Sequence, residues 1–214
     1  MAKVKAQISI SLDGYIAGPN QGEQNPLGEG GEDLHEWVFK LASWRDAHGR
    51  EGGEEDNPSN AVIKAAQEGT GAVVMGRNMF GPVRGPWGEP AWNGWWGDDP
   101  PFHTPAFVLT HHEREPLEME GGTTFYFVTE GVESAIAQAK EVAGDKDVSI
   151  GGGAETIQQA LVAGLLDELL LNQVPILLHG GSRLLDNLEG ASPTFALTSL
   201  VEGPEATHLT YSVS

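Results

Sequence analysis

The stretch Asp147–Leu171, DVSIGGGAETIQQALVAGLLDELLL, decides the fold. Val148 and Ile150 predict a strand, three glycines predict a turn at 151–153, and apolar residues near helical spacing predict a helix over 154–163. Gly164 suits the position that follows a helix, and the leucines after it predict a second strand. Strand, turn, helix and strand therefore follow one another with almost no spare residues.

The glycine turn and the helix start are suited to an anion. Glycine lets backbone N–H groups approach a ligand closely, and the first turn of a helix adds unpaired N–H donors and a positive dipole end. We expect a phosphate or pyrophosphate at this place. The alternative is a turn that is glycine-rich only because it is tight, and Thr156 stands where the dinucleotide fingerprint has its third glycine.

Length and charge limit the possible functions. The 214 residues contain no linker that would mark a second domain, so we expect a single domain over 1–214. The formal net charge of −19 repels phosphate backbones and anionic lipids, which argues against a nucleic-acid or membrane partner. The absence of cysteine excludes disulfides, thiolate metal sites and thiol nucleophiles. No apolar run is long enough to span a bilayer and the amino terminus lacks a signal-peptide core, so we expect a cytoplasmic protein.

Strands and helices alternate along the rest of the chain. We expect strands over 3–12, 72–75, 106–110 and 124–128, helices over 33–48, 57–68 and 131–142, and a closing hairpin of 195–200 with 208–213. Pro175 predicts that the strand it interrupts is an edge strand or carries a bulge. This pattern predicts an α/β fold with a mostly parallel sheet covered by helices on both faces. Ligands of such sheets bind at the carboxyl ends of the strands, where Gly76-Arg77, Thr110-His111 and the glycine run all fall.

Five segments carry a resemblance to a known family. SLDGYIAG at 11–18, VVMGRNMFG at 73–81, FVLTHH at 107–112, SIGGGAETIQQAL at 149–161 and LLDELLLNQVPILLHGG at 165–181 occur in this order. The chain resembles the dihydrofolate-reductase-like superfamily over nearly its whole length. It is most similar to the branch that contains the reductase domain of the riboflavin-biosynthesis deaminase/reductase. The deaminase module with its zinc-ligand spacing is missing from the sequence, and the resemblance implies no metal site.

The resemblance implies an NADPH cofactor that lies across the strand ends. Ile16 and Ala17 would border the nicotinamide, and residues 151–156 would hold the pyrophosphate. The remaining contacts would come from two strand ends. The implied cofactor-binding residues are Ile16, Ala17, Gly76, Arg77, Asn78, Met79, Leu109, Thr110, His111, Arg114, Gly151, Gly152, Gly153, Ala154, Glu155 and Thr156. The implied reaction is hydride transfer to a small heterocyclic or imine-bearing substrate, as in 5-amino-6-(5-phosphoribosylamino)uracil reductase or dihydrofolate reductase. A non-catalytic module that binds a nicotinamide nucleotide is the alternative.

Two carboxylates are candidates for the substrate acid. Dihydrofolate reductases place a carboxylate on their first helix, and Asp33 could take that place. A first-turn residue favoured by the helix dipole is the alternative for Asp33. Asp13 shares strand parity with Ser9 and Ser11 and could face the site, although Asp13-Gly14 also fits an ordinary turn.

Cofactor choice is assigned to three cationic or polar residues. Arg77 ends one strand, and His111 and Arg114 follow the strand expected beside it, so they could receive the 2′-phosphate of NADPH. The alternative is that Arg77 pairs with a nearby acid and Arg114 lies in solvent. The segment 84–105 holds four tryptophans among glycines and prolines, and it could be a substrate lid, a subunit contact or packing. The resemblance also suggests a homodimer.

Overall fold

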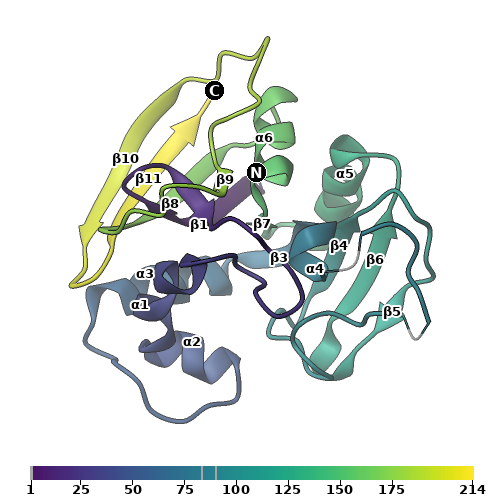
Figure 1. The fold of residues 1–214 in the computed structure, drawn as a ribbon, viewed down its shortest axis with the longest axis horizontal. Coiled ribbons are helices and arrows are strands. Elements are labelled where there is room, and N and C mark those ends of the chain that lie inside the picture. Colours follow the sequence, from purple (N-terminus) through teal and green to yellow (C-terminus); the bar gives the residue numbers. More distant parts are fainter. Residues whose placement is uncertain (1, 83, 90) are drawn as a thin grey trace.

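A nine-stranded mixed sheet runs through the whole molecule in the computed structural model, which describes residues 2–82, 84–89 and 91–214. Its strand order is β10-β11-β8-β1-β7-β3-β4-β6-β5, so the amino-terminal strand lies near the centre and the carboxyl-terminal hairpin forms one edge (Figure 1). The strands are β1 (Val4–Ser11), β3 (Thr70–Gly76), β4 (Pro105–Leu109), β5 (Leu117–Glu118), β6 (Thr124–Val128), β7 (Asp147–Gly152), β8 (Glu168–Val174), β10 (Phe195–Glu202) and β11 (Thr207–Val213). A separate small ladder pairs β2 (Tyr15–Ala17) with β9 (Ser182–Arg183).

Most of the sheet is parallel, as the alternation of strands and helices predicts. β1 is parallel to both β7 and β8, and the ladders β7–β3, β3–β4 and β4–β6 are parallel as well. Antiparallel pairing is confined to β5 at one edge and to β8–β11–β10 at the other. The expected carboxyl-terminal antiparallel hairpin is therefore confirmed.

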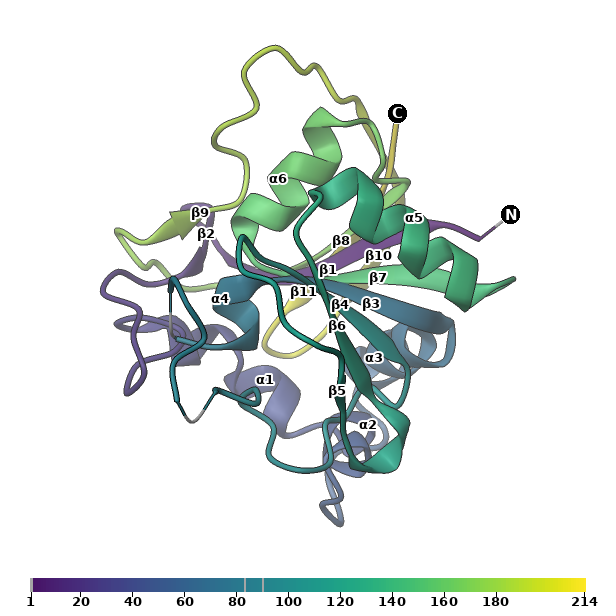
Figure 2. The ribbon, with the colours of Figure 1, turned by 90° about the vertical axis from the view of Figure 1, so that its right-hand side faces the viewer.

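Helices cover both faces of the sheet, as Figure 2 shows. On one face lie α5 (Val132–Ala143) and α6 (Ala154–Val162), which pack Ile136 and Ile157 onto Val74 and Val148. The other face carries η1 (Gly31–Leu34), α1 (Glu36–Phe39), α2 (Ala42–Ala47), α3 (Pro58–Glu68) and α4 (Arg77–Phe80), and the short η2 spans Glu120–Gly122. Alternate residues of β3 explain this arrangement, because Ala72 and Val74 face α5 and α6 while Val73 and Met75 face the opposite side.

The segment Asp147–Leu171 folds as expected, with β7, the turn, α6 and β8 in succession. The end of α6 is a Schellman motif: Gly164 has φ +65°, its N–H donates to Leu161 O at 3.1 Å, and Leu165 N–H donates to Ala160 O at 2.9 Å. Gly164 is thus needed for its left-handed backbone. The peptide bond between Gly152 and Gly153 is cis.

The single helix predicted over 33–48 is wrong. The chain forms η1, α1 and α2 instead, and Leu41 between the last two is extended, with φ −74° and ψ 140°. The cause is a backbone contact with a distant loop, in which Glu54 N–H donates to Lys40 O at 2.8 Å and Ala42 N–H donates to Glu54 O at 3.4 Å. A helix cannot continue through residues whose backbone groups are bonded outside it.

The edge position predicted from Pro175 is also wrong, since β8 lies between β1 and β11. The strand ends at Val174, whose partner Ser11 is the last residue of β1. Pro175 therefore stands just beyond the ladder, where a missing N–H removes no ladder hydrogen bond.

The tryptophan-rich segment 84–105 has no helix or strand among its described residues up to β4, as predicted, but it is packed against the sheet. Trp87, Trp92 and Trp96 join the cluster of Phe80 and Phe125 on the face opposite α5 and α6. Trp92 Nε1 donates to Phe80 O at 3.1 Å, and a Cβ on Gly81 would overlap the Trp92 ring. Packing is thus the observed state of these three tryptophans.

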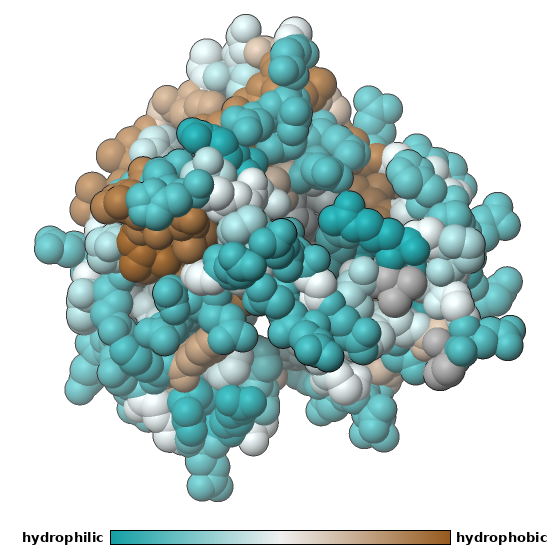
Figure 3. All heavy atoms as spheres, in the orientation of Figure 1, coloured by the Kyte–Doolittle hydropathy of each residue, from teal (hydrophilic) through white to brown (hydrophobic). Residues whose placement is uncertain are grey.

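One apolar surface is left open on the hairpin edge. Phe195, Leu197 and Leu200 of β10 are exposed, the last two by 53% and 59%. A bulge between Leu197 and Ser199 keeps both leucines on one face, because their partners Tyr211 and Leu209 are two residues apart. Hydrophobic surface gathers over this side of the molecule in Figure 3.

Candidate cofactor site at the strand ends

The ends of β3 and β7 meet the start of α6 in a close apposition of glycines. A Cβ added to Gly76 would lie 2.7 Å from Thr156 Oγ1 and 3.7 Å from Gly153 N. Gly76 has φ −80°, so its backbone suits any residue and the close approach of Thr156 is what requires glycine. The end of β3 and the start of α6 therefore lie so close together that no side chain fits between Gly76 and the Thr156 hydroxyl.

The three glycines at 151–153 differ in how much space surrounds them. A Cβ on Gly151 would lie 3.1 Å from Met79 Cε, and one on Gly152 would lie 3.4 Å from Met79 Sδ. A Cβ on Gly153 would meet nothing within 4 Å. Gly152 also has φ +132°, a backbone region that favours glycine. Met79 thus supports the turn from one side, and Gly153 leaves free space.

The start of α6 supplies hydrogen-bond donors to this place. Ile157 N–H donates to Gly153 O at 3.3 Å, so the N–H groups of Ala154, Glu155 and Thr156 precede the helical ladder. The positive end of the helix dipole lies at the same point. Backbone amides and a helix start beside the free space at Gly153 are suited to a pyrophosphate, so these residues fit the implied cofactor.

A second cluster joins the ends of β3 and β4, which are neighbours as predicted. The Arg77 guanidinium carbon lies 3.0 Å from the ring centre of Trp87, and that of Arg114 lies 4.8 Å from the same ring. Arg114 also donates to Trp92 O at 2.5 Å and to Asn93 Oδ1 at 2.8 Å. Arg114 is therefore held by the tryptophan-rich segment, contrary to the alternative that it lies in solvent.

The two arginines influence each other electrostatically. Burial, and after it the charge of Arg114, lowers the pKa of Arg77 to about 10, and burial also lowers the pKa of Arg114. Both guanidiniums remain charged at neutral pH. The Nη1 and Nη2 atoms of Arg77 are buried, so a contact of this pair with a phosphate stays a prediction.

Residues after β4 form a tight turn beside this pair. Thr110 is buried, and its Oγ1 accepts the His112 N–H at 3.2 Å. Trp87 Nε1 donates to His112 O and to Glu113 O, both at 3.1 Å. His111 is exposed, as is Asn78 at the start of α4. The turn thus places Thr110 and His111 next to the Trp87 contact.

The remaining predicted cofactor contacts lie around these two clusters. Ile16 and Ala17 are buried in β2, and Ile16 packs in the core beneath α6. Leu109 ends β4 and packs against the same core, while Glu155 is exposed on the first turn of α6. Their contacts with a cofactor stay predictions.

Asp13 connects two loops. It accepts hydrogen bonds from Ser11 Oγ at 2.6 Å, His179 N at 2.8 Å and Leu178 N at 3.2 Å. The hydroxyl of Ser11, followed by these two amides, lowers the pKa of Asp13 to about 2. Asp13 is thus ionised at neutral pH, where it can orient neighbouring groups but has no proton to give.

Asp33 lies on η1, which packs beside β1 and β2, and its side chain is exposed. Its neighbours Leu34 and Trp37 point into the protein, where Trp37 Nε1 donates to Leu34 O at 2.9 Å and lies 3.3 Å from Ser9 Oγ. Asp33 as the substrate acid stays a prediction.

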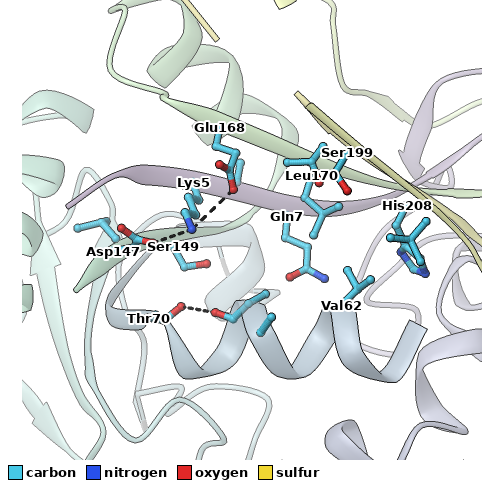
Figure 4. A pocket seen from close by; sticks show the side chains of 16 residues that line it. Lys5, Gln7, Val62, Thr70, Asp147, Ser149, Glu168, Leu170, Ser199 and His208 are labelled. Carbon is cyan, nitrogen blue, oxygen red and sulfur yellow. Dashed lines mark hydrogen bonds and ion pairs between the residues drawn. The ribbon is translucent and has the colours of Figure 1, made fainter. Parts of the chain in front are cut away.

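A separate cavity of about 220 Å³ lies between α3 and the sheet, near the amino ends of β1, β7 and β8 (Figure 4). Lys5, Gln7 and Ser149 line it, and Lys5 Nζ is paired with Asp147 at 2.6 Å and with Glu168 at 3.6 Å. The charged groups at this end of the sheet satisfy one another. The candidate ligand site is therefore the one at the opposite, carboxyl ends of the strands, where Gly153 leaves free space.

Trp87 is the site residue that sequence reasoning missed. The sequence shows four tryptophans in a glycine- and proline-rich segment but gives no period that singles one out. The arginines could have indicated this contact, because a partly buried guanidinium often stacks on an aromatic ring. Two arginines at neighbouring strand ends and an aromatic-rich segment between them could have suggested the contact.

Comparisons with known proteins agree with this architecture. A family model described as the RibD C-terminal domain matches residues 2–209. A putative riboflavin biosynthesis protein from Shewanella sp. PV-4 is similar in structure, with a TM-score of 0.65, 25% identity and 99% of each chain covered. The Thermotoga maritima diaminohydroxyphosphoribosylaminopyrimidine deaminase/5-amino-6-(5-phosphoribosylamino)uracil reductase gives a TM-score of 0.61 at 13% identity. Acinetobacter baumannii RibD gives a TM-score of 0.58 at 16% identity.

The coverage of the last two comparisons differs from that of the first. The whole chain is matched, but it spans 57% of the Thermotoga protein and 58% of the Acinetobacter protein, so these two likenesses concern the fold.

No curated protein matches the chain. The described residues include no helix with the length and apolar character needed to cross a membrane. The fold is dihydrofolate-reductase-like, and the chain belongs to the RibD C-terminal domain family.

Proposed function

We propose that this protein is an NADPH-dependent reductase that transfers a hydride to a C=N or C=C bond of a small heterocyclic or imine-bearing substrate. Its family and fold support an oxidoreductase related to the riboflavin-biosynthesis reductases. The observation that carries the proposal is the apposition of Gly76 with Thr156 and Gly153, beside the paired guanidiniums of Arg77 and Arg114. One end of this arrangement suits a pyrophosphate and the other suits a phosphate monoester.

The chain's own residues would bind and orient the cofactor. Backbone N–H groups of 153–156 would receive the pyrophosphate, and Arg77 and Arg114, with Thr110 and His111 beside them, would receive the 2′-phosphate. Ile16 and Ala17, which are buried in β2, would exclude water on the nicotinamide side. When bound, the cofactor supplies the hydride. We propose Asp33 as the residue that meets the substrate, because the carboxylate of Asp13 is committed to three donors.

Two measurements on the purified chain test the function. Titration with NADPH, followed by cofactor fluorescence, should show saturable binding. A screen of pterin, uracil and quinone-like compounds, followed by NADPH absorbance, should show turnover with one compound class. Binding without turnover on any of these compounds would favour a non-catalytic nucleotide-binding module. Absence of binding would overturn the assignment of the strand-end site.

A further inference from the structure

We infer that Gln158 is a positioning residue of the cofactor site: its buried amide fixes the nicotinamide side of that site, at β2, relative to the pyrophosphate side, at the start of α6. The inference rests on the proposed function and deepens it. It assigns the alignment of the dihydronicotinamide ring with the substrate to a side chain that acts through β9 and β2.

The Gln158 amide joins α6 to the small ladder of β2 and β9, which lies beside this helix (Figure 2). Its Nε2 donates to Arg183 O at 2.9 Å and to Leu184 O at 3.1 Å. Its Oε1 accepts a hydrogen bond from Asn187 Nδ2 at 3.2 Å. Gln158 is 4% exposed, so both N–H donors and the acceptor of its amide are satisfied inside the protein.

Gln158 lies one helical turn from the groups that would hold the pyrophosphate. Residues four apart lie on the same face of a helix, so Gln158 stands next to Ala154, the first residue of α6. The N–H groups of residues 154–156 precede the helical ladder and are the expected pyrophosphate donors. Because the backbone of one helical turn is fixed by its hydrogen bonds, the Gln158 amide keeps a constant separation from these donors.

β9 connects the Gln158 amide to β2. The two strands are antiparallel, and Ser182 of β9 lies opposite Ala17, the last residue of β2. Leu184, which follows β9, donates its N–H to Gly14 O at 3.2 Å, just before β2 begins. The carbonyls that receive the two Gln158 donors therefore belong to a segment that is bonded at both ends of β2. In the proposed function, β2 is the strand that borders the nicotinamide.

Directional bonds matter here because the apolar contacts in the same place do not fix a register. Ile16, Ile157 and Leu184 belong to one core cluster. Hydrophobic contacts are non-directional, so they hold β2 near α6 without setting its exact position. Hydride transfer requires reacting atoms about 3–3.5 Å apart, and a displacement of about 1 Å can slow a reaction about a hundredfold. Two hydrogen bonds from one planar amide supply the missing constraint.

The test compares variants of the full chain at Gln158 and at its neighbour. Gln158→Met keeps the length of the side chain and removes its donors, while Gln158→Glu keeps its shape and presents a carboxylate to the two carbonyls. Gln159→Met is the matched control, because Gln159 is the next residue of α6 and is exposed. Dissociation constants are measured for NADPH and for 2′-phospho-ADP-ribose, which is the same dinucleotide without the nicotinamide. The turnover number kcat is measured with the compound class that the wild type reduces.

We expect 2′-phospho-ADP-ribose to bind both Gln158 variants as it binds the wild type. The affinity advantage of NADPH over this fragment should shrink, and kcat should fall about tenfold to a hundredfold. Gln159→Met should change neither quantity. Equal losses for NADPH and the fragment would show that Gln158 acts on the fold alone, and would overturn the inference. An unchanged kcat, or a wild type that binds NADPH no better than the fragment, would overturn it as well.

If neither Gln158 variant folds, Asn187→Gly decides by the same comparison. Asn187 is exposed and has φ +56°, so glycine suits its backbone, and the substitution removes the donor to Gln158 Oε1. We expect the same pattern with smaller changes. A wild type that binds neither NADPH nor the fragment would overturn the proposed function itself, which is a distinct result.

Discussion

Gly76 and Thr156 face each other so closely that a Cβ on Gly76 would lie 2.7 Å from the Thr156 hydroxyl oxygen. We expect Gly76→Ala to cost about 1–3 kcal/mol of stability through overpacking, and to weaken NADPH binding because it moves the β3 end away from α6. The double variant Gly76→Ala/Thr156→Ala removes the clashing oxygen and should recover most of the stability. Urea denaturation measures both changes. An equal loss of stability in the single and the double variant would show that the Thr156 hydroxyl is not what excludes a Cβ at Gly76.

The glycine run gives a second prediction. Gly152 has φ +132°, so Gly152→Val should strain the turn by about 1–3 kcal/mol and sharply reduce cofactor affinity while the fold survives. Gly164→Val is the control, because Gly164 also has positive φ but lies at the far end of α6. Calorimetric titration with NADPH should show a raised dissociation constant for Gly152→Val and an unchanged one for Gly164→Val. An unchanged dissociation constant in Gly152→Val would remove the pyrophosphate assignment.

The arginine pair predicts the cofactor preference directly. Charge-assisted hydrogen bonds to a phosphate are worth about 1.5–3 kcal/mol each, so Arg77→Ala and Arg114→Ala should each lower NADPH affinity by about tenfold to a hundredfold. NADH affinity should change little in both variants. Titrations at low and high salt check the electrostatic origin, since salt should weaken NADPH binding more in the wild type than in the variants. A wild type without any preference would contradict the assignment.

A buried histidine predicts a dependence of stability on pH. His208 lies between Asn172 Oδ1, 2.7 Å from its Nδ1, and Ser59 Oγ, 2.8 Å from its Nε2, and burial lowers its pKa below 6.5. Above pH 6.5 the ring is neutral in both the folded and unfolded chains, so its contribution is constant. As the pH falls below 6.5, the unfolded chain takes up the proton first, and stability declines.

The measurement is the free energy of unfolding between pH 5 and pH 8. His208→Gln should flatten the decline but not abolish it, because burial also lowers the pKa values of His35 and His48. Identical slopes for His208→Gln and the wild type would show that His208 does not contribute.

The open face of β10 predicts self-association. We propose that a second copy of this chain covers Phe195, Leu197 and Leu200, since two identical apolar faces can meet across a two-fold axis. Light scattering should report a dimer for the wild type and a folded monomer for Leu197→Asp/Leu200→Asp. Val142→Asp, which alters an exposed apolar residue on α5, should leave the dimer intact. A monomeric wild type at micromolar concentration would end the proposal.

Local patterns explain which parts of the fold could be predicted. The unit from β7 to β8 follows from apolar spacing and glycine positions within 28 consecutive residues, and the neighbouring ends of β3 and β4 follow from strand–helix alternation. The break at Leu41 depends on Glu54, which approaches it only in the folded chain. Trp87 could not be chosen among four tryptophans, because no period in the segment distinguishes it and its contacts with Arg77 and Arg114 exist only in the folded chain.

The central position of β1 has a consequence for how the chain acquires its fold. Val4 pairs with Val148, and Lys3 N–H donates to Asp147, 144 residues further along the chain. During synthesis β1 therefore cannot pair with β7, and its apolar face stays uncovered, until most of the polypeptide has left the ribosome. Contacts of such long sequence separation slow folding, to times on the order of milliseconds to seconds or longer.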